Sequence, residues 1–425
     1  MCIGNSKWLG WLCCGALLIP QVLCAEEAVP GVPSDARDFE ESDSKQVSDA
    51  AREREVGSEE DPLESEKVDV EELRDETIDR GYIRLYGSAR VRYRQVDSES
   101  IWSDGGSRIG VSGGWRVNPQ LRVFARGEAG INLLDEVDFL FNRGDRPQGQ
   151  KFGDTLFLRL GYAGIETRGV VLTAGKNWST YYRVSSFTDR FQGTGASASG
   201  TYNAGTDGGY TGTGRADRIL QARASFGKLE GNSAFKPISL EIQVQNGEPI
   251  PQGQGKEYNT TIGLSSFLET NIGLAFGAAY NHANIDDADL PVLRSIGIDG
   301  DARALVAGTR WYGERWYVGT VVSRLDNHET TNEGIYFDGT GWEVYSQYRV
   351  LGPWWAIAGW NRLKPDSDQV QAGAFKIDYG VLGIRYSFQD FRQMIFANVR
   401  FESGSAQNGY TFSDVYTVGV RWDLP

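Results

Sequence analysis

The residues best suited to catalysis are two histidines, His282 and His328, the only ones in the 425-residue chain. Ser323 and Asp326 precede His328, and Asp286-Asp287 follows His282, so a Ser/His/Asp or Asp/His hydrolytic site is conceivable. No nucleophile motif surrounds Ser323, and isolated histidines in loops are usually solvated. A hydrolase therefore stays a rival interpretation, which loss of activity on replacing a histidine by alanine would support.

Other chemistry-bearing residues point away from metals, cofactors and nucleic acids. Asp286-Asp287 and Asp299-Gly300-Asp301 lack the spacing of a dedicated calcium site. No phosphate-binding glycine motif occurs, and no basic patch interleaved with aromatic residues. All four cysteines lie within the first 25 residues: Cys2, Cys13, Cys14 and Cys24. The rest of the chain therefore has neither a disulfide framework nor a cysteine-based zinc cluster.

The arginines of the segment Gly81–Val96 fall only at even positions. Arg84, Arg90, Arg92 and Arg94 occupy even positions, whereas odd positions include Ile83, Leu85, Val91 and Tyr93. A period of two is typical of a strand. Similar alternation in Ile238–Val244 and Ile272–Tyr280 predicts further strands with one apolar and one polar or small face. Frequent glycines and aromatics also favour β structure.

The N-terminus predicts export. Lys7 precedes an apolar run from Trp8 to Pro20, and Cys24-Ala25 is followed by acidic residues, so residues 1–25 are expected to be a signal peptide. The run is too short for a membrane anchor. A lipoprotein acylated at Cys24 is a weaker alternative, because Leu23 is an unfavourable residue before a modified cysteine. No later stretch reaches the ~20 apolar residues of a spanning helix, so the mature chain would enter a membrane only as strands.

Residues 26–80 carry the acidity of the chain. They hold 21 acidic and 7 basic residues, whereas residues 81–425 hold 36 acidic and 35 basic residues. Such a segment cannot bury a core, so it is expected to be a disordered or partly helical periplasmic extension. A short helix from Glu66 to Arg80, forming a coiled coil in an oligomer, is an alternative.

Sixteen strands are expected after residue 81, joined by short turns on one side and long loops on the other. This pattern, with an even strand count, is typical of a bacterial outer-membrane barrel. A soluble β-sandwich would alternate too, but does not explain the export signal and one-sided loops together. Tryptophans near strand ends suit interfacial girdles: Trp115, Trp311, Trp316, Trp354, Trp355 and Trp422. The strands lie near 82–96, 107–115, 121–131, 155–165, 169–175, 217–226, 238–246, 258–266, 272–281, 302–312, 316–324, 341–350, 354–363, 376–387, 391–401 and 415–424.

The arginines must face the interior of such a barrel. An arginine on the lipid face at mid-membrane costs roughly 2–4 kcal/mol. The same parity turns Arg122, Arg126 and Arg159 inward. A charged interior holds water, and sixteen strands leave an aqueous channel. For the outermost arginines, Arg84 and Arg94, a place at the rim beside anionic lipid headgroups is an alternative.

The connection 176–216 has 41 residues and is long enough to be functional or disordered. Its first half is aromatic, with Trp178, Tyr181 and Tyr182. We expect this half to fold into the barrel and narrow the pore, with Asp189 opposite the wall arginines, so that the field filters ions by sign and size. An exposed surface loop is the alternative.

Over residues 82–424, the chain resembles the general diffusion porins of Gram-negative outer membranes. The matching segments are Leu85-Tyr86-Gly87, Ser107-Arg108-Ile109-Gly110, Leu158–Gly164 and Thr173-Ala174-Gly175-Lys176. The resemblance implies a sixteen-stranded homotrimer whose third loop forms the constriction. The resemblance places Arg108 and Arg159 in the basic cluster of the constriction, with Arg218 or Arg223 as the last member of that cluster. The acidic side of the constriction would begin with Thr188-Asp189.

The sequence departs from the family pattern in three places. The Pro-Glu-Phe-Gly-Gly segment is absent after Asp189, so one constriction carboxylate is missing and weak anion preference is expected. Ser88 stands where a basic residue follows Leu-Tyr-Gly, although Arg90 lies one inward step further on. The chain end lacks the usual terminal aromatic residue, so Trp422 would serve in barrel insertion.

The sequence therefore predicts an all-β, sixteen-stranded antiparallel transmembrane β-barrel, residues 81–425, in the cell outer membrane. Its function would be passive diffusion of small hydrophilic solutes and ions, without cofactor or catalytic residue. The expected partners are further copies in a homotrimer, outer-membrane lipids and lipopolysaccharide. A structural or adhesive barrel with a sealed lumen and a sugar-selective porin with an aromatic slide, for which Tyr181 and Tyr182 are candidates, are alternatives. The expected pore-lining residues are Asp189 on the acidic side and Arg90, Arg92, Arg108, Arg122, Arg126, Arg159, Arg218 and Arg223 on the basic side.

Overall fold

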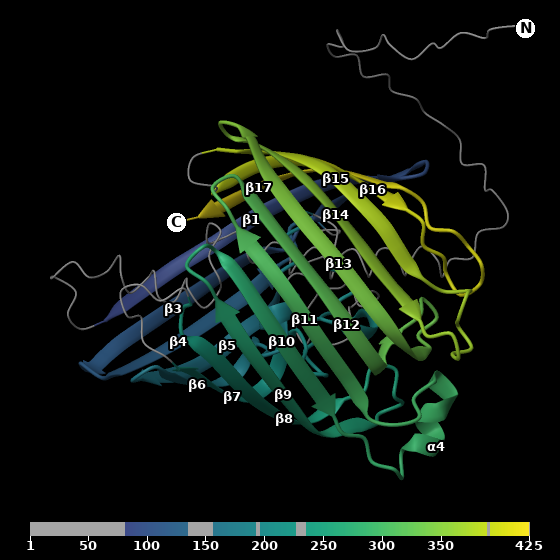
Figure 1. Cartoon of the computed structure of the whole chain (residues 1–425), viewed down its shortest axis with the longest axis horizontal. Helices are drawn as coiled ribbons and strands as arrows, with labels where there is room; N and C mark the ends of the chain where they lie inside the picture. Colours follow the sequence, from purple (N-terminus) through teal and green to yellow (C-terminus); the bar gives the residue numbers. More distant parts are fainter. Residues whose placement is uncertain (1–80, 135–155, 193–195, 227–234, 389–391, 425) are drawn as a thin grey trace, which may run out of the picture.

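The chain folds into a closed antiparallel barrel (Figure 1). The computed structural model describes residues 81–134, 156–192, 196–226, 235–388 and 392–424. The predicted signal peptide and acidic extension lie outside these ranges. The strands are β1 Tyr82–Val96, β2 Glu99–Asp104, β3 Ser107–Asn118, β4 Leu121–Ile131, β5 Leu156–Thr167, β6 Val170–Trp178, β7 Arg215–Phe226, β8 Ile238–Pro249, β9 Glu257–Glu269, β10 Leu274–Ala283, β11 Ala302–Tyr312, β12 Trp316–Thr330, β13 Tyr336–Leu351, β14 Trp354–Pro365, β15 Ile377–Ser387, β16 Gln393–Glu402 and β17 Val415–Leu424.

The seventeen strands of the described ranges fill sixteen places around the barrel wall, the number that was predicted, because β2 and β3 share one place. β3 pairs with residues 82–88 of β1, and β2 pairs with residues 91–96 of the same strand. The two short strands therefore lie end to end on one side of β1 and fill one position, separated by Gly105-Gly106. The sequence prediction omitted β2. The wall closes where β17 pairs with β1 from Gly87–Leu424 to Val96–Val415.

Four short helical segments lie in the connections within the described ranges. They are α3 Tyr182–Ser185, η2 Asn203–Gly205, α4 Leu290–Leu293 and η3 Arg294–Ile296. No helix in the described ranges has the length and apolar character needed to cross a membrane.

Alternating burial separates an inner from an outer face on each strand. In β17, Arg421 is 1% exposed, whereas the next residue, Trp422, is 53% exposed. Val418 and Val420 share the outer face with Trp422. The period of two therefore turns charged residues into the barrel and apolar ones toward lipid.

Connections differ in length at the two ends of the barrel. Short turns join β3 to β4, β5 to β6, β11 to β12 and β13 to β14, whereas longer segments join β6 to β7, β10 to β11 and β16 to β17. The C-terminus and α4 lie at opposite ends of the strands (Figure 1). Both termini of the described barrel, at β1 and β17, belong to the short-turn end.

Two local predictions were wrong. The interval 325–340 was expected to be a long loop, but β12 and β13 continue into it and pair as far as Thr330 and Tyr336. The hairpin extends because its backbone hydrogen bonds continue beyond a register shift after Leu325. Trp355 was expected in an interfacial girdle, but is 2% exposed because it neighbours the outward Trp354 and so takes the inner face.

Candidate pore and constriction loop

Buried arginines line one wall of the barrel on its inner face. We call Arg90, Arg92, Arg108, Arg159 and Arg421 the basic ladder; they come from β1, β3, β5 and β17 and are at most 4% exposed. All but Arg421 were predicted to line the pore. They lie on neighbouring strands because the chain closes β17 onto β1. Their burial strengthens their electrostatic field, since the dielectric constant is lower than in water.

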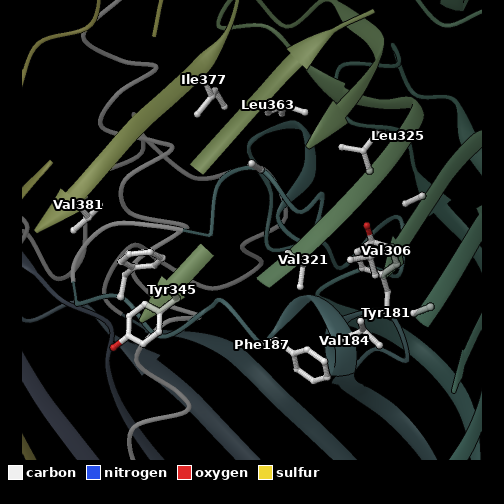
Figure 2. Close-up of a cluster of buried hydrophobic side chains, with 14 of the residues drawn as sticks. Tyr181, Val184, Phe187, Val306, Val321, Leu325, Tyr345, Leu363, Ile377 and Val381 are labelled. Carbon is white, nitrogen blue, oxygen red and sulfur yellow. The ribbon is translucent and has the colours of Figure 1, made fainter. Parts of the chain in front are cut away.

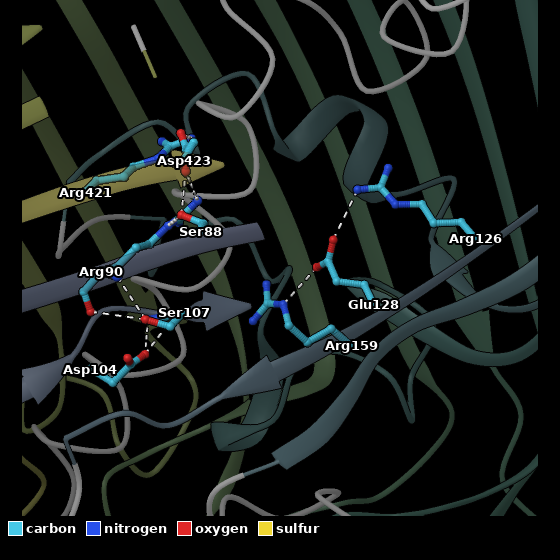
Figure 3. A network of polar contacts seen from close by, with 10 residues as sticks. Ser88, Arg90, Asp104, Ser107, Arg126, Glu128, Arg159, Arg421 and Asp423 are labelled. Carbon is cyan, nitrogen blue, oxygen red and sulfur yellow. Dashed lines mark hydrogen bonds and ion pairs between the residues drawn. The ribbon is translucent and has the colours of Figure 1, made fainter. Parts of the chain in front are cut away.

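A polar network crosses the seam between β1 and β17 (Figure 3). The Ser88 hydroxyl donates to Asp423 Oδ1 at 2.5 Å, and Arg90 Nε donates to Ser88 Oγ at 2.7 Å. Arg421 Nε donates to Asp423 at 3.0 Å. Ser88, where a basic residue was expected, thus connects an arginine to a carboxylate. The network joins the first and last strands by side chains as well as backbone.

A second network centres on Glu128 of β4 (Figure 3). Arg159 Nε and Arg126 Nη2 each lie 3.1 Å from its carboxylate. The Tyr86 hydroxyl donates to Glu128 at 2.8 Å and accepts from Arg126 Nε at 2.7 Å. Two guanidinium groups therefore share one carboxylate, which leaves this wall with a positive excess.

Three other predicted arginines lie apart from the ladder. Arg122 pairs with Glu166 at 2.7 Å near the short-turn end. Arg218 has a side chain that is 61% exposed and pairs with Glu248 at 2.5 Å. Arg223 shares the inner-facing register of β7 with Ile219 and Gln221. Of the two candidates on this strand, Arg223 therefore has the lumenal orientation.

The long connection between β6 and β7, residues 179–214, is here called loop 3, and its described parts are 179–192 and 196–214. It packs against the inner wall, and its residues Tyr181, Val184, Phe187 and Phe191 are fully buried. They form one cluster with wall residues such as Val306, Val321 and Tyr345 (Figure 2). The aromatic first half thus folds into the barrel, as its composition predicted.

Hydrogen bonds attach loop 3 to several strands. Glu343 of β13 accepts from the Thr188 hydroxyl and from Ala198 N, the latter at 2.7 Å. Gln243 of β8 accepts from Thr180 N and donates to Gly212 O, both at 2.7 Å. Asn398 of β16 donates to Gln192 O. These attachments span β8 to β16, across the barrel from most of the basic ladder.

Asp189 lies inside loop 3 at 1% exposure. Its Oδ2 oxygen accepts hydrogen bonds from the hydroxyls of Tyr182 at 3.0 Å and Tyr202 at 2.9 Å. Tyr182 also stacks on Trp178, with ring centroids 3.8 Å apart. The carboxylate predicted for the acidic side of the constriction therefore joins the two halves of the loop.

An ionic clamp holds the base of loop 3. Lys176 Nζ lies 2.8 Å from Asp207 and 2.9 Å from Asp217, and Arg215 Nε lies 3.4 Å from Asp207. Burial opposes ionisation of Asp207, but Lys176 and Arg215 outweigh it and hold the pKa of Asp207 at about 2. The strand that enters the loop and the strand that leaves it are thus tied through one charged side chain.

The two histidines occupy separate environments. His282 Nε2 lies 2.9 Å from Asp301, and its side chain is 35% exposed. His328 is 1% exposed, with Nε2 2.7 Å from Gly200 O. The Ser323 hydroxyl donates to Ala198 O at 2.9 Å. His328 and Ser323 therefore both contact loop 3 through its carbonyl groups.

Sequence reasoning missed several inner-face residues that the structure brings together. Arg421, Asp423 and Glu128 complete the networks described above, and Glu343 attaches loop 3. Alternation alone could have found Arg421 and Asp423. In the β17 segment Val-Arg-Trp-Asp-Leu they alternate with the outward residues Val420, Trp422 and Leu424. Arg385 and Arg400 are also inward, at 4% and 6% exposure.

The family described as Gram-negative porin matches residues 76–424. The chain belongs to this family. It is therefore an outer-membrane β-barrel that acts as a diffusion channel, as predicted. No curated protein sequence matches this porin.

Solved structures share the barrel at low sequence identity. OmpF of Salmonella typhi, in complex with daunomycin, is 20% identical, with a TM-score of 0.64 over 81% of this porin and 98% of OmpF. An anion-selective porin from Comamonas acidovorans is 13% identical, with a TM-score of 0.55 over 81% and 100% of the two chains. OmpT of Vibrio cholerae in its trimer form is 14% identical, with a TM-score of 0.54 over 81% and 100%.

Proposed function

We propose that this porin is a passive channel with a weak preference for anions. The observation that carries the proposal is the charge of the inner wall formed by β15–β17 and β1–β5. Fixed positive charge beside a water-filled path attracts anions and repels cations. Among the described residues, the buried inward side chains of this wall include Arg90, Arg92, Arg94, Arg108, Arg159, Arg385, Arg400 and Arg421, against the carboxylates Glu128, Glu402 and Asp423.

Loop 3 would form the narrow part of this channel. Its contacts with β8–β16 leave the path of solutes between the loop and the basic ladder. Arg90, Arg92, Arg108, Arg126 and Arg159 would line that path, with Arg223 as the member from β7. Asp189 would act by holding the loop together, since its Oδ2 oxygen accepts hydrogen bonds from Tyr182 and Tyr202 of the loop. The name of the Comamonas acidovorans porin, which is anion-selective, agrees with this direction of selectivity.

A homotrimer is the proposed assembly. The outer face of β3–β5 carries small residues: Gly113, Ala125, Gly127, Ala129 and Ala163. The outer face of β8 and β9 instead carries Leu240, Ile242, Ile262 and Leu264, each between 43% and 46% exposed. Small side chains let two walls approach closely, so the β3–β5 face suits contact between subunits. The trimer form of the Vibrio cholerae OmpT supports the same assembly.

The remaining assignments belong to the same proposal. Residues 1–25 would be a signal peptide and residues 26–80 a periplasmic extension. Outer-membrane lipids and lipopolysaccharide would surround the barrel. The channel would work without catalysis, since Ser323 and His328 contact loop carbonyls. A sugar slide is disfavoured because Tyr181 packs into the apolar cluster between loop 3 and the wall, and Tyr182 stacks on Trp178.

Planar-bilayer recording of the purified mature protein across a KCl gradient tests the proposal. We expect ohmic current steps in groups of three and a reversal potential of the sign that indicates chloride preference. A folded, inserted protein without current steps would instead support a structural or adhesive barrel. A reversal potential that indicates potassium preference would contradict the role given to the basic ladder.

A further inference from the structure

A row of glycines crosses the inner wall beneath loop 3. Each of six consecutive strands contributes one glycine in an inner-facing register. Gly277 and Gly308 are direct cross-strand neighbours. The members of this glycine row are Gly263 on β9, Gly277 on β10, Gly308 on β11, Gly319 on β12, Gly341 on β13 and Gly359 on β14.

A Cβ atom at any position of the glycine row would meet loop 3. At Gly263 it would lie 2.6 Å from Thr180 Oγ1, and at Gly277 it would lie 2.8 Å from Val184 Cγ2. At Gly308 it would lie 3.2 Å from the Phe187 ring and also 2.7 Å from Thr320 O and Val321 Cγ1 of the neighbouring strand β12. Real Cβ atoms essentially never come within 3.0 Å of another heavy atom, so most of these sites have no room for a side chain.

The collisions at the other three positions are more severe. A Cβ atom at Gly319 would overlap the carbonyl oxygen of Phe187, and one at Gly341 would overlap that of Ala198. A Cβ atom at Gly359 would overlap the ring of Phe191. The row thus follows the course of loop 3 from Thr180 to Ala198.

Backbone conformation does not explain these glycines. None of the six has a positive φ, so any residue could adopt their backbone conformation. Glycine in the interior of a strand weakens the strand and often marks the close approach of another backbone. Six such positions, each facing the same loop, therefore serve the approach of loop 3 to the wall.

We infer that the glycine row sets the width of the channel. The wall strands are hydrogen-bonded on both sides in a closed barrel, so they cannot retreat from an added side chain. Loop 3 is the part that would yield, and it would move into the lumen toward the basic ladder. Larger residues in the row would therefore narrow the path between loop 3 and the arginines. This inference deepens the channel function.

Single glycine-to-alanine variants test the inference in bilayers. Gly319→Ala and Gly341→Ala push on the loop backbone, so we expect their single-channel conductance to fall about twofold, since permeation depends on pore diameter. The exclusion size in liposome-swelling assays should fall too. Gly380→Ala is the matched control: it lies on β15, and the nearest atom to its Cβ position is Gly359 O at 3.9 Å. Its conductance should equal that of the wild type.

A rescue variant separates pore width from a general loss of folding. Gly277→Ala collides with the side chain of Val184, 2.8 Å from the added Cβ atom, and Val184→Ala removes the colliding Cγ atoms. We expect the single variant Gly277→Ala to conduct less and the double variant to regain wild-type conductance. Wild-type conductance in folded Gly319→Ala and Gly341→Ala, or a double variant as low as Gly277→Ala, would overturn the inference. Absence of current in the wild type would instead contradict the channel function.

Discussion

Arg159 and Glu128 meet at 3.1 Å on the inner face of the barrel, where neither side chain is more than 1% exposed. Arg126 lies at the same distance from that carboxylate. Glu128 therefore balances one of two positive charges, and the wall keeps an excess of positive charge on the side of the proposed solute path.

Arg159→Gln is expected to reduce anion preference. The variant removes one buried positive charge, while Arg126 and Tyr86 still satisfy Glu128. The stability cost should thus stay below the roughly 3–5 kcal/mol of leaving a buried charge unpaired. The reversal potential in a KCl gradient should move toward that of a cation-preferring channel. Arg218→Gln is the control, because that side chain is 61% exposed; an equal shift in both variants would contradict the assignment.

Glu343→Gln is expected to loosen loop 3. The carboxylate accepts hydrogen bonds from Thr188 and Ala198, whereas an amide has only one accepting oxygen. One buried donor would lose its partner, at a cost of about 1–3 kcal/mol. Open-channel current noise should rise relative to Glu166→Gln, a partly exposed carboxylate near the short-turn end. Equal noise in the two variants would show that Glu343 does not hold the loop.

Gly127→Trp is expected to prevent trimer formation. Its nearest neighbour across the outer face is Val111, 3.9 Å from a Cβ atom placed at Gly127, so an indole would project into the proposed subunit contact. Ile242→Trp places the same side chain on the outer face of β8 and should leave trimers intact. Native-like electrophoresis of the unheated proteins distinguishes the two. Trimers of normal stability in Gly127→Trp would place the contact elsewhere on the barrel.

The clamp at the base of loop 3 is expected to resist acid. The pKa of Asp207 is held at about 2, below its value of about 3.9 in an unfolded chain. The stabilisation is therefore complete above about pH 4 and is lost as the pH falls through 2. The difference in conductance between the wild type and Asp207→Asn should stay constant from pH 7 to 4 and shrink only in stronger acid. Asp207→Asn should show the altered conductance already at pH 7; wild-type behaviour in this variant would exclude the clamp.

Alternation in the sequence predicted the barrel and the direction of its arginines. Arg90, Arg92 and Arg159 face inward because the strand period leaves no other choice once lipid covers the opposite face. The length and aromatic content of the third connection likewise predicted that it packs inside. These features depend only on local spacing and on the cost of exposing charge to lipid.

The contacts that position loop 3 could not be predicted from the sequence. Glu343, Asn398 and Asn361, whose Oδ1 oxygen accepts from Ser197 N at 3.1 Å, are isolated polar residues in strands. Nothing near them in sequence identifies the loop atoms they bind. Asp189 was assigned to the lumen from its place in the loop, and nothing in the sequence indicated that the hydroxyls of Tyr182 and Tyr202 donate to its carboxylate. Such pairings depend on how distant segments meet. Strand β2 was not predicted for a different reason: its six residues lie within what looks in the sequence like a turn.

The attachments of loop 3 also constrain the order of assembly. Gln192 and its partner Asn398 are 206 residues apart, and Thr188 and Glu343 are 155 residues apart. Contacts between such distant positions form late, since their loop-closure entropy must be paid before they stabilise anything. A barrel whose first half has paired would therefore still lack the strands that seat the loop. The narrowing of the passage is accordingly one of the last events in folding, completed only when the C-terminal strands have joined the wall.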